Sequence, residues 1–164
     1  MDEQKRSNNF IKHMKPRKNG FYHQGTLDPK KFDKCAVKDQ PIIFRSGLEK
    51  RFIQYVQNQS SITKWASEAF AIPYYSRLDK RQANYYPDFI IENKDGHKTI
   101  VEIKPYAQTK RPKEADSAWL KEQWIKNTDK WKAAMDFAKK HEMKFIIVTE
   151  KFFDWQQWLH KTKD

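Results

Sequence analysis

The sequence predicts an α/β domain in which a mixed β-sheet is flanked by helices, and three observations support this prediction. Two runs rich in β-branched and aromatic residues lie on either side of Asp95-Gly96, within residues 85–105, and predict a β-hairpin. A capped amphipathic segment precedes this hairpin. A helical region followed by a short apolar strand comes after it, which is typical of a crossover back onto the same sheet. We therefore expect the element order α-β-β-β-α-α-β-α.

The first predicted helix begins after Ser46, because residues 46–49 (Ser-Gly-Leu-Glu) match a capping box. Apolar residues at helical spacing then extend this helix to about Asn58. The following segment, Ile62–Tyr75, is interrupted by Pro73, which cannot donate within a central ladder. This segment predicts two short strands, or one bent strand, near a sheet edge.

Two helical segments are expected after the hairpin, about Ser117–Lys126 and Thr128–His141, the second with Thr128 as its N-cap. Trp131 lies on the apolar stripe of the second helix, so burial in the core is favoured over stacking on a base. The run Phe145–Thr149 is continuously apolar and predicts a strand that is buried on both faces, and therefore internal or parallel. The aromatic segment Phe152–Leu159 predicts a final docked helix.

The register of the hairpin decides whether its two acidic residues meet. A two-residue loop would place Asp88 and Glu102 on opposite faces of the sheet. A three-residue loop, residues 94–96, would place them directly opposite each other on one face. It would also put Gly96 at the left-handed position that a type I turn with a bulge requires. We predict the three-residue loop, which brings the two Cβ atoms to about 5 Å.

Directly opposed carboxylates repel each other, so this register indicates a bound cation. Hard oxygen ligands suit Mg²⁺ or Mn²⁺, which keep several waters and accept phosphate oxygens. Lys104 follows on the same face, where a lysine could orient or deprotonate a water or neutralise charge in a transition state. The five histidines are scattered without ligand spacing, and no glycine-rich phosphate loop is present. We therefore expect neither a histidine-based site nor a nucleotide cofactor.

Basic residues dominate the composition. The chain carries 33 Lys and Arg against 21 Asp and Glu, a net charge of +12, with a pI near 9.6. This balance favours a polyanionic partner, nucleic acid before a membrane surface, over the alternative of a solvated lysine surface. Cys35 is the single cysteine, which excludes an internal disulfide and argues against a zinc cluster. No run approaches the roughly 20 apolar residues of a membrane span and no secretory signal opens the chain, so we expect a cytoplasmic protein without a membrane partner.

The chain divides into two predicted parts. Residues 1–40 form a basic, poorly structured N-terminal arm, and residues 41–164 form one domain. The arm holds ten Lys or Arg and five Asp or Glu, and it either wraps the domain and contacts phosphates or remains a tethered tail. Two basic loops flank the hairpin and are candidates for contacting DNA, with solvated turns as the alternative. Their residues are Arg77, Lys80, Arg81, Lys110, Arg111 and Lys113.

The pattern Pro87-Asp88, followed by Glu102-Ile103-Lys104, resembles the signature of the PD-(D/E)XK nuclease superfamily, whose members hydrolyse nucleic-acid phosphodiesters with divalent metal. Within the superfamily, residues 44–149 resemble the head-completion nucleases of tailed phages, which are similar to the nuclease subunit that cuts transposon ends. The segments that carry this closer resemblance are Phe44–Glu49, Trp65–Glu68, Ile72–Tyr75, Tyr86–Phe89 and Glu102–Pro105.

The resemblance implies a restriction-endonuclease-like core and a metal-dependent DNA endonuclease. It implies that Asp88 and Glu102 hold one or two Mg²⁺ or Mn²⁺ ions, together with the carbonyl of Ile103 and the side chain of Glu49. Lys104 would orient the attacking water. The role of Glu49 stays open, because a carboxylate bound to its own helix cap faces backward. We favour the ligand role on the resemblance alone.

The same resemblance implies DNA, and capsid or portal proteins, as partners, in the host cytoplasm or the phage head. It leaves Glu68 without an assigned role, apart from satisfying a backbone group or a basic partner within the fold. Two other hypotheses remain open. The protein could be a structural DNA-binding head component with a non-catalytic site, or a nuclease subunit for transposition or repair.

Overall fold

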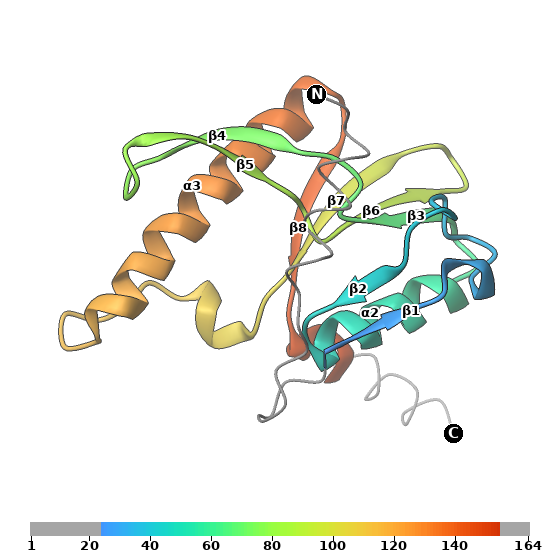
Figure 1. The fold of residues 1–164 in the computed structure, drawn as a ribbon, viewed down its shortest axis with the longest axis horizontal. Helices are drawn as coiled ribbons and strands as arrows, with labels where there is room; N and C mark the ends of the chain where they lie inside the picture. Colours follow the sequence, from blue (N-terminus) through green and yellow to red (C-terminus); the bar gives the residue numbers. More distant parts are fainter. Residues whose placement is uncertain (1–23, 155–164) are drawn as a thin grey trace.

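A four-stranded mixed sheet lies at the centre of the part of the chain that the computed structural model describes, residues 24–154 (Figure 1). Its strand order is β3-β6-β7-β8. The strands are β3 (Ile62–Ser67), β6 (Phe89–Asn93), β7 (Lys98–Ile103) and β8 (Lys144–Val148). The first three are antiparallel neighbours and β8 is parallel to β7. The predicted α/β fold with a mixed sheet is confirmed.

The first helix, α2, spans Gly47–Asn58, the bounds that the sequence predicts. The Ser46 side chain accepts a hydrogen bond from the Glu49 N–H at 3.1 Å and so caps the helix. The helix buries Phe52, Ile53 and Val56. These apolar side chains pack against one face of the sheet, where a buried cluster also contains Trp65, Phe89, Val101, Ile103 and Val148.

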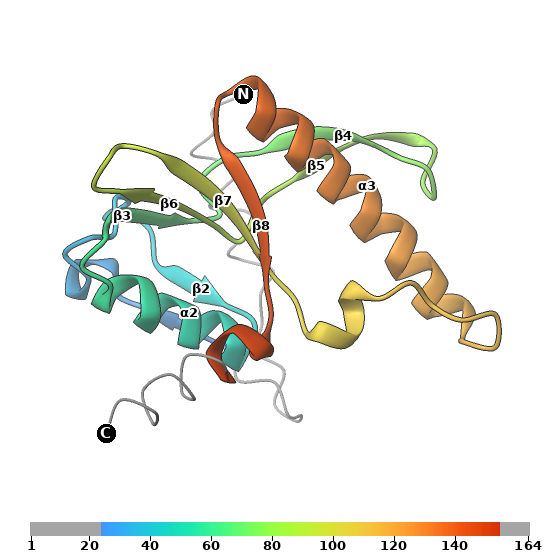
Figure 2. The ribbon, with the colours of Figure 1, turned by 180° about the vertical axis from the view of Figure 1, so that it is seen from behind.

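The second helix, α3, is continuous from Ala118 to Lys140, and Ser117 caps it. The prediction of two helices separated at Thr128 is therefore wrong. The Thr128 hydroxyl donates to the carbonyl of Trp124, one turn earlier, instead of capping a new helix. Trp131 is buried, which confirms its predicted place in the core. The helix packs against β4, β7 and β8, on the other side of the sheet from α2 (Figure 2).

A two-stranded sheet of β4 (Ile72–Ser76) and β5 (Arg81–Tyr85) lies beside α3 (Figure 1). Of the two alternatives for Ile62–Tyr75, two short strands or one bent strand, the structure has the first, because β3 and β4 are separate. The predicted basic loop is shorter than expected, since Arg81 already belongs to β5. Three residues, 86–88, then separate β5 from β6.

The segment before α2 packs against the domain. It contains β1 (Gly25–Leu27), the 3₁₀ helix η1 (Pro29–Lys31) and β2 (Ile42–Phe44), and β1 pairs with β2. Between them Cys35 is buried and bridges to Trp65 at the free edge of β3. Residues 24–40 of the predicted N-terminal arm thus have defined structure. Its remainder, residues 1–23, lies outside the described residues.

The connection from β7 through α3 to β8 is the predicted crossover, and β8 is parallel to β7 as expected. However, β8 is the last strand in the sheet order and Ile146 is 40% exposed. The prediction that this strand is buried on both faces is therefore wrong. Between β7 and α3 lies a second 3₁₀ helix, η2 (Tyr106–Thr109). Residues 150–154 are helical, and the rest of the predicted terminal helix lies outside the described residues. No helix among residues 24–154 is long and apolar enough to span a membrane.

The β6–β7 hairpin has the predicted three-residue loop. Asn93 N–H donates to the His97 carbonyl at 3.0 Å, and Gly96 N–H donates to the Asn93 carbonyl at 3.0 Å. Gly96 has φ of 79°, in the left-handed region. Paired positions in the ladder, such as Phe89 with Val101, follow the register that places Asp88 next to Glu102.

The alternation of side chains along β7 divides its residues between two cores. Val101 and Ile103 belong to the cluster on the α2 side, whereas Ile100 belongs to a second cluster with residues of β4, β5 and α3. Glu102 has the same parity as Ile100, so its carboxylate faces the α3 side of the sheet.

Replacing Gly96 with alanine should lower the free energy of unfolding by about 1–2 kcal/mol, the usual penalty for a side chain in the left-handed region. No atom lies within 4 Å of the position that the new Cβ would occupy, so the penalty comes from the backbone alone. Urea unfolding would measure it. Asp95→Ala, in the same loop, is the control and should change stability by a few tenths of a kcal/mol, roughly. Equal effects of the two variants would contradict the strain at Gly96.

Candidate active site

Two opposed carboxylates mark the point where β6 begins and β7 ends. Asp88 and Glu102 occupy the positions directly beyond the last ladder pair, Phe89 with Val101. Asp88 Oδ2 accepts a hydrogen bond from the Ile103 N–H at 2.7 Å. Glu102 is only 4% exposed. A buried acid therefore lies beside a second acid that is fixed by the backbone of the neighbouring strand.

Glu102 has one donor on each carboxylate oxygen. The hydroxyl of Tyr85, at the end of β5, donates to Oε2. The Lys104 ammonium lies 3.2 Å from Oε1. Burial and the charge of Glu102 raise the pKa of Tyr85, so the phenol stays protonated and keeps its donor role. Tyr85 was missed as a site residue, because its contact depends on how β5 folds back over β7.

Burial raises the pKa of Asp88 well above its usual range, and the negative charges of Glu102 and then Glu49 raise it further. The Ile103 N–H and the charge of Lys104 act in the opposite direction but do not offset these effects. The charges of Glu102 in β7 and Glu49 in α2 thus both act on Asp88, at the start of β6. A cation bound there would relieve this repulsion.

The Ser46 half of the predicted capping box forms, but Glu49 accepts from the N–H of the residue before the cap and not from that of Ser46. Glu49 Oε2 accepts the Arg45 N–H at 3.0 Å, and its Oε1 accepts the Ser46 hydroxyl at 3.2 Å. Burial raises the pKa of Glu49. Because its charge also raises the pKa of Asp88, Glu49 lies within electrostatic reach of the two opposed acids. In this arrangement its oxygens are already used at the helix cap.

An ion pair between Arg45 and Glu68 borders the site. Both guanidinium Nη atoms of Arg45 donate to the Glu68 carboxylate. The backbone of Glu68 has φ of 46°. The Glu68 N–H donates to the Asp88 carbonyl at 3.1 Å. Glu68 therefore has the basic partner that the sequence left undefined, and its backbone fixes the chain at Asp88.

Lys130 of α3 is a site residue that the sequence analysis missed. Its ammonium lies 5.7 Å from the centre of the Tyr85 ring. Burial lowers the pKa of Lys130, while the charge of Glu102 raises it and that of Lys104 lowers it. A signal was available, because Lys130 lies one turn before Ala134 on the buried stripe of the helix. Only the crossing of α3 over β7 turns that position toward Glu102.

The predicted DNA-contacting residues lie in two separate segments. Arg77, at the turn between β4 and β5, donates from Nε to Asp129 of α3 at 2.6 Å. Lys80 closes that turn with φ of 49°, and Arg81 begins β5, about 13 Å along the strand from Tyr85. The second segment follows η2 and contains the remaining predicted residues, Lys110, Arg111 and Lys113. The fold does not bring either segment onto the carboxylates through any hydrogen bond or ion pair between described residues.

The donor set at the carboxylates fits a hard divalent cation. Lys104 N–H donates to the Val148 carbonyl in β8 at 3.0 Å. Since a trans peptide points its C=O and N–H in opposite directions, the Ile103 carbonyl points away from β8, toward the side of Asp88. Two carboxylates and this carbonyl are ligands that suit Mg²⁺ or Mn²⁺ with several waters. Across residues 24–154 no group of three or more acidic, histidine or cysteine side chains could hold a metal ion as it stands.

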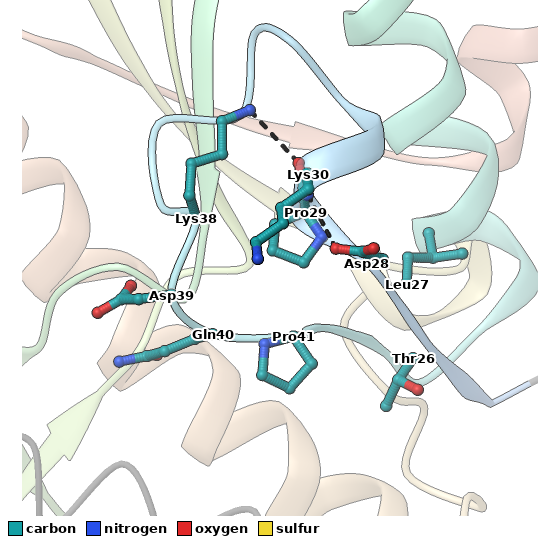
Figure 3. A pocket seen from close by; sticks show the side chains of 9 residues that line it. All are labelled: Thr26, Leu27, Asp28, Pro29, Lys30, Lys38, Asp39, Gln40 and Pro41. Carbon is teal, nitrogen blue, oxygen red and sulfur yellow. Dashed lines mark hydrogen bonds between the residues drawn. The ribbon is translucent and has the colours of Figure 1, made fainter.

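A hollow on the opposite part of the domain has a different character (Figure 3). It is lined by residues 26–30 and 38–41, none of which is a candidate site residue. Two of its polar side chains are used within the chain, because Asp28 caps η1 by accepting the Lys30 N–H and Lys38 Nζ donates to the Pro29 carbonyl. This hollow therefore gives no reason to place the chemistry away from Asp88 and Glu102.

Replacing Asp88 with asparagine should stabilise the metal-free protein at pH 8. The folded-state pKa of Asp88 is raised, so the charged form destabilises the fold at any pH above that pKa. Asparagine removes the charge and still accepts the Ile103 N–H. The melting temperature should rise by about 2–4 °C for each kcal/mol regained. Thermal unfolding at pH 8 in the presence of a chelator measures the difference.

The stability gain of Asp88→Asn over wild type should shrink as the pH falls through the folded-state pKa of Asp88. Below that pKa the wild-type carboxyl is protonated, so the wild-type protein no longer carries the destabilising charge that the substitution removes. Asp95→Asn, in the exposed hairpin loop, serves as the control and should show no comparable gain. An Asp88→Asn variant that is less stable than wild type at pH 8 would contradict the electrostatic account.

Two comparisons place this geometry among known proteins. Residues 59–150, more than half of the chain, match the family described as TnsA-like endonuclease N terminal. The matched span includes Asp88, Glu102, Lys104 and Lys130, and begins after Glu49. The chain is also 32% identical over 137 residues to the head completion nuclease of Enterobacteria phage T4, which covers 78% of this chain and 91% of that relative. Nucleases of this type generally use divalent metals. The chain thus belongs to the TnsA-like endonucleases of the PD-(D/E)XK nuclease superfamily.

Proposed function

We propose that this protein is a divalent-metal-dependent DNA endonuclease that acts in phage head completion. The observation that carries the proposal is the pair of opposed carboxylates, Asp88 and Glu102, with Lys104 in contact with Glu102. This is the arrangement that the resemblance to the superfamily implies, in a chain that belongs to an endonuclease family. A relative with 32% sequence identity is the head completion nuclease of Enterobacteria phage T4.

Asp88, Glu102 and the Ile103 carbonyl would hold Mg²⁺ or Mn²⁺. When bound, the ion would activate a water and offset the charge that develops on the phosphodiester. Glu49 would serve as a further ligand after leaving its helix cap. Releasing it would leave the Arg45 N–H without its partner, at a cost of about 1–3 kcal/mol that binding would have to exceed.

The chain's own residues have distinct roles around the scissile phosphate. The Lys104 ammonium would orient the attacking water and stabilise negative charge as it develops. Tyr85 and Lys130 would hold Glu102 in position, the first through its hydroxyl and the second through its charge. Tyr85 is buried in β5 and Lys130 is partly buried on α3, so both side chains would need little reorganisation during the reaction.

Affinity for DNA would come from basic residues outside the carboxylate pair. The net charge of +12 favours contacts with phosphates, which position DNA without reading its sequence. Lys80, Arg81, Arg111 and Lys113 are proposed to make such contacts, together with Lys110. Arg77 would do so only in part, because its guanidinium already pairs with Asp129. Capsid or portal proteins are proposed as further partners, in the infected host cytoplasm and the phage head.

Alanine variants of Asp88 and Lys104 should lose metal-dependent cleavage of supercoiled, linear and branched DNA while retaining DNA binding. A fall of at least 100-fold in the cleavage rate is expected, since each removes a group that acts at the reacting phosphate. The assay compares Mg²⁺ and Mn²⁺ with a chelator. Metal should also raise the melting temperature of wild type but not that of Asp88→Ala.

A wild-type protein that binds DNA with either metal, and never cuts it, would overturn the proposal. Identical behaviour of wild type and both variants would then favour a structural head component. Asp95→Ala controls for loss of an unrelated carboxylate and should cleave as wild type does.

Lys130→Met should lower the cleavage rate at saturating DNA by roughly 10- to 100-fold, because a fixed positive charge is lost beside Glu102. It should not lower thermal stability, since a buried lysine with a lowered pKa destabilises the fold in its charged form. Lys130→Arg should recover part of the activity. The matched control is Lys132→Met, on the exposed face of the same helix, where the lysine pairs with Asp136. Equal effects at the two positions would contradict the role of Lys130.

A further inference from the structure

Two lysines converge on the ring of Tyr106, the first residue of η2. Lys151 Nζ lies 3.4 Å from the ring centre and Lys110 Nζ lies 4.8 Å from it. Lys110 comes from the end of η2, whereas Lys151 follows β8 by three residues. We call these three residues the Tyr106 cluster. Two segments far apart in the sequence thus supply its charges.

The cluster carries more positive charge than its surroundings offset. Among the described residues neither lysine forms an ion pair with a carboxylate. The nearby Glu150 is used elsewhere, because its Oε2 accepts the Tyr106 N–H at 2.7 Å. A hydrogen bond with Lys110, and then the charges of Lys110 and Lys151, lower the pKa of Tyr106, so both ammonium groups lie close to its hydroxyl as well as its ring. Two cations and one hydroxyl donor at one point are the groups that bind a phosphate.

The cluster lies next to the candidate active site. β7 and β8 are parallel, so their carboxyl ends meet at one edge of the sheet, where Lys104 and Glu102 also lie. In Figure 2, η2 lies between this end of β7 and the start of α3. Tyr106 follows Lys104 by two residues, an extended distance of about 7 Å. Neighbouring phosphates on one strand of duplex DNA are farther apart than the axial rise of about 3.4 Å, because the backbone winds around the axis. The span from Lys104 to Tyr106 therefore corresponds to about one nucleotide.

We propose that the Tyr106 cluster binds the internal DNA phosphate that neighbours the phosphate that is cut. The inference rests on the proposed nuclease function and assigns a further contact to it. Lys151 covers the face of the ring, which leaves that face closed to a stacked base and favours a phosphate as the ligand. Its role is to position the strand, not to take part in the chemistry.

The test compares full-length wild type with Tyr106→Phe and with Lys110→Ala/Lys151→Ala. DNA binding is measured between 50 and 200 mM salt in chelator, and cleavage is measured with Mg²⁺ over a range of DNA concentrations. The double variant should lose about one unit of the salt slope, because one phosphate contact is removed, so its affinity should fall roughly three- to fourfold less over that range. Tyr106→Phe should bind several-fold more weakly. In the cleavage assay both variants should need more DNA than wild type to reach half of their maximal rate, because the cluster acts on DNA binding.

The matched control is Lys94→Ala, in the hairpin loop at the far end of β7 from Lys104. It should leave the salt slope within experimental error of wild type. A double variant that behaves like Lys94→Ala would overturn the inference.

A second arm locates the phosphate. In a short duplex with a mapped cut position, single phosphates are replaced by neutral methylphosphonates. Replacement of the phosphate next to the one that is cut should weaken wild-type binding but have no further effect on the double variant, whereas other replacements should act on both equally. Equal effects at every position would overturn the inference alone. Absence of any cleavage by wild type would overturn the proposed function, and the inference with it.

Discussion

The opposition of two carboxylates at the end of the β6–β7 hairpin is the constraint on which the rest of the structure depends. Like charges directly opposite each other destabilise a sheet. The fold holds them there with the Ile103 N–H on Asp88 and with a tyrosine hydroxyl and a lysine on Glu102. These donors come from β5 and β7 and are placed by backbone that cannot shift independently. The packing of the domain thus holds the two carboxylates in place and offsets the repulsion between them.

The two faces of the sheet have different roles, one in packing and the other in holding the charged groups. The α2 side is a continuous apolar core, and Phe89, Val101 and Ile103 alternate into it from the strands that carry the acids. The α3 side combines a smaller apolar cluster with the charged groups at its edge. Because neighbouring residues of β7 point to opposite faces, the side chains that anchor the strand also orient Glu102. Rigidity on one face therefore supports the geometry on the other.

The helix cap of α2 and the acids are linked. Glu49 both caps the helix and raises the pKa of Asp88, and the neighbouring Arg45 pairs with Glu68, whose backbone fixes the chain at Asp88. The start of α2 is thereby connected to the site through polar contacts rather than apolar packing. The TnsA-like match begins after this helix, so its strands and α3 carry the family likeness by themselves.

Local rules determined much of this protein from the sequence. The Ser46 cap, the bounds of α2 and the β6–β7 register follow from contacts within a few residues, and the register alone places Asp88 opposite Glu102. Thr128 misled the helix prediction, because only the packed helix shows that its hydroxyl turns back to Trp124. Tyr85 and Lys130 reach Glu102 through β5 and α3, and Lys151 reaches Tyr106 from beyond β8. Such contacts join residues far apart in the chain. Local sequence periodicity therefore does not predict them, and they are determined by the tertiary structure alone.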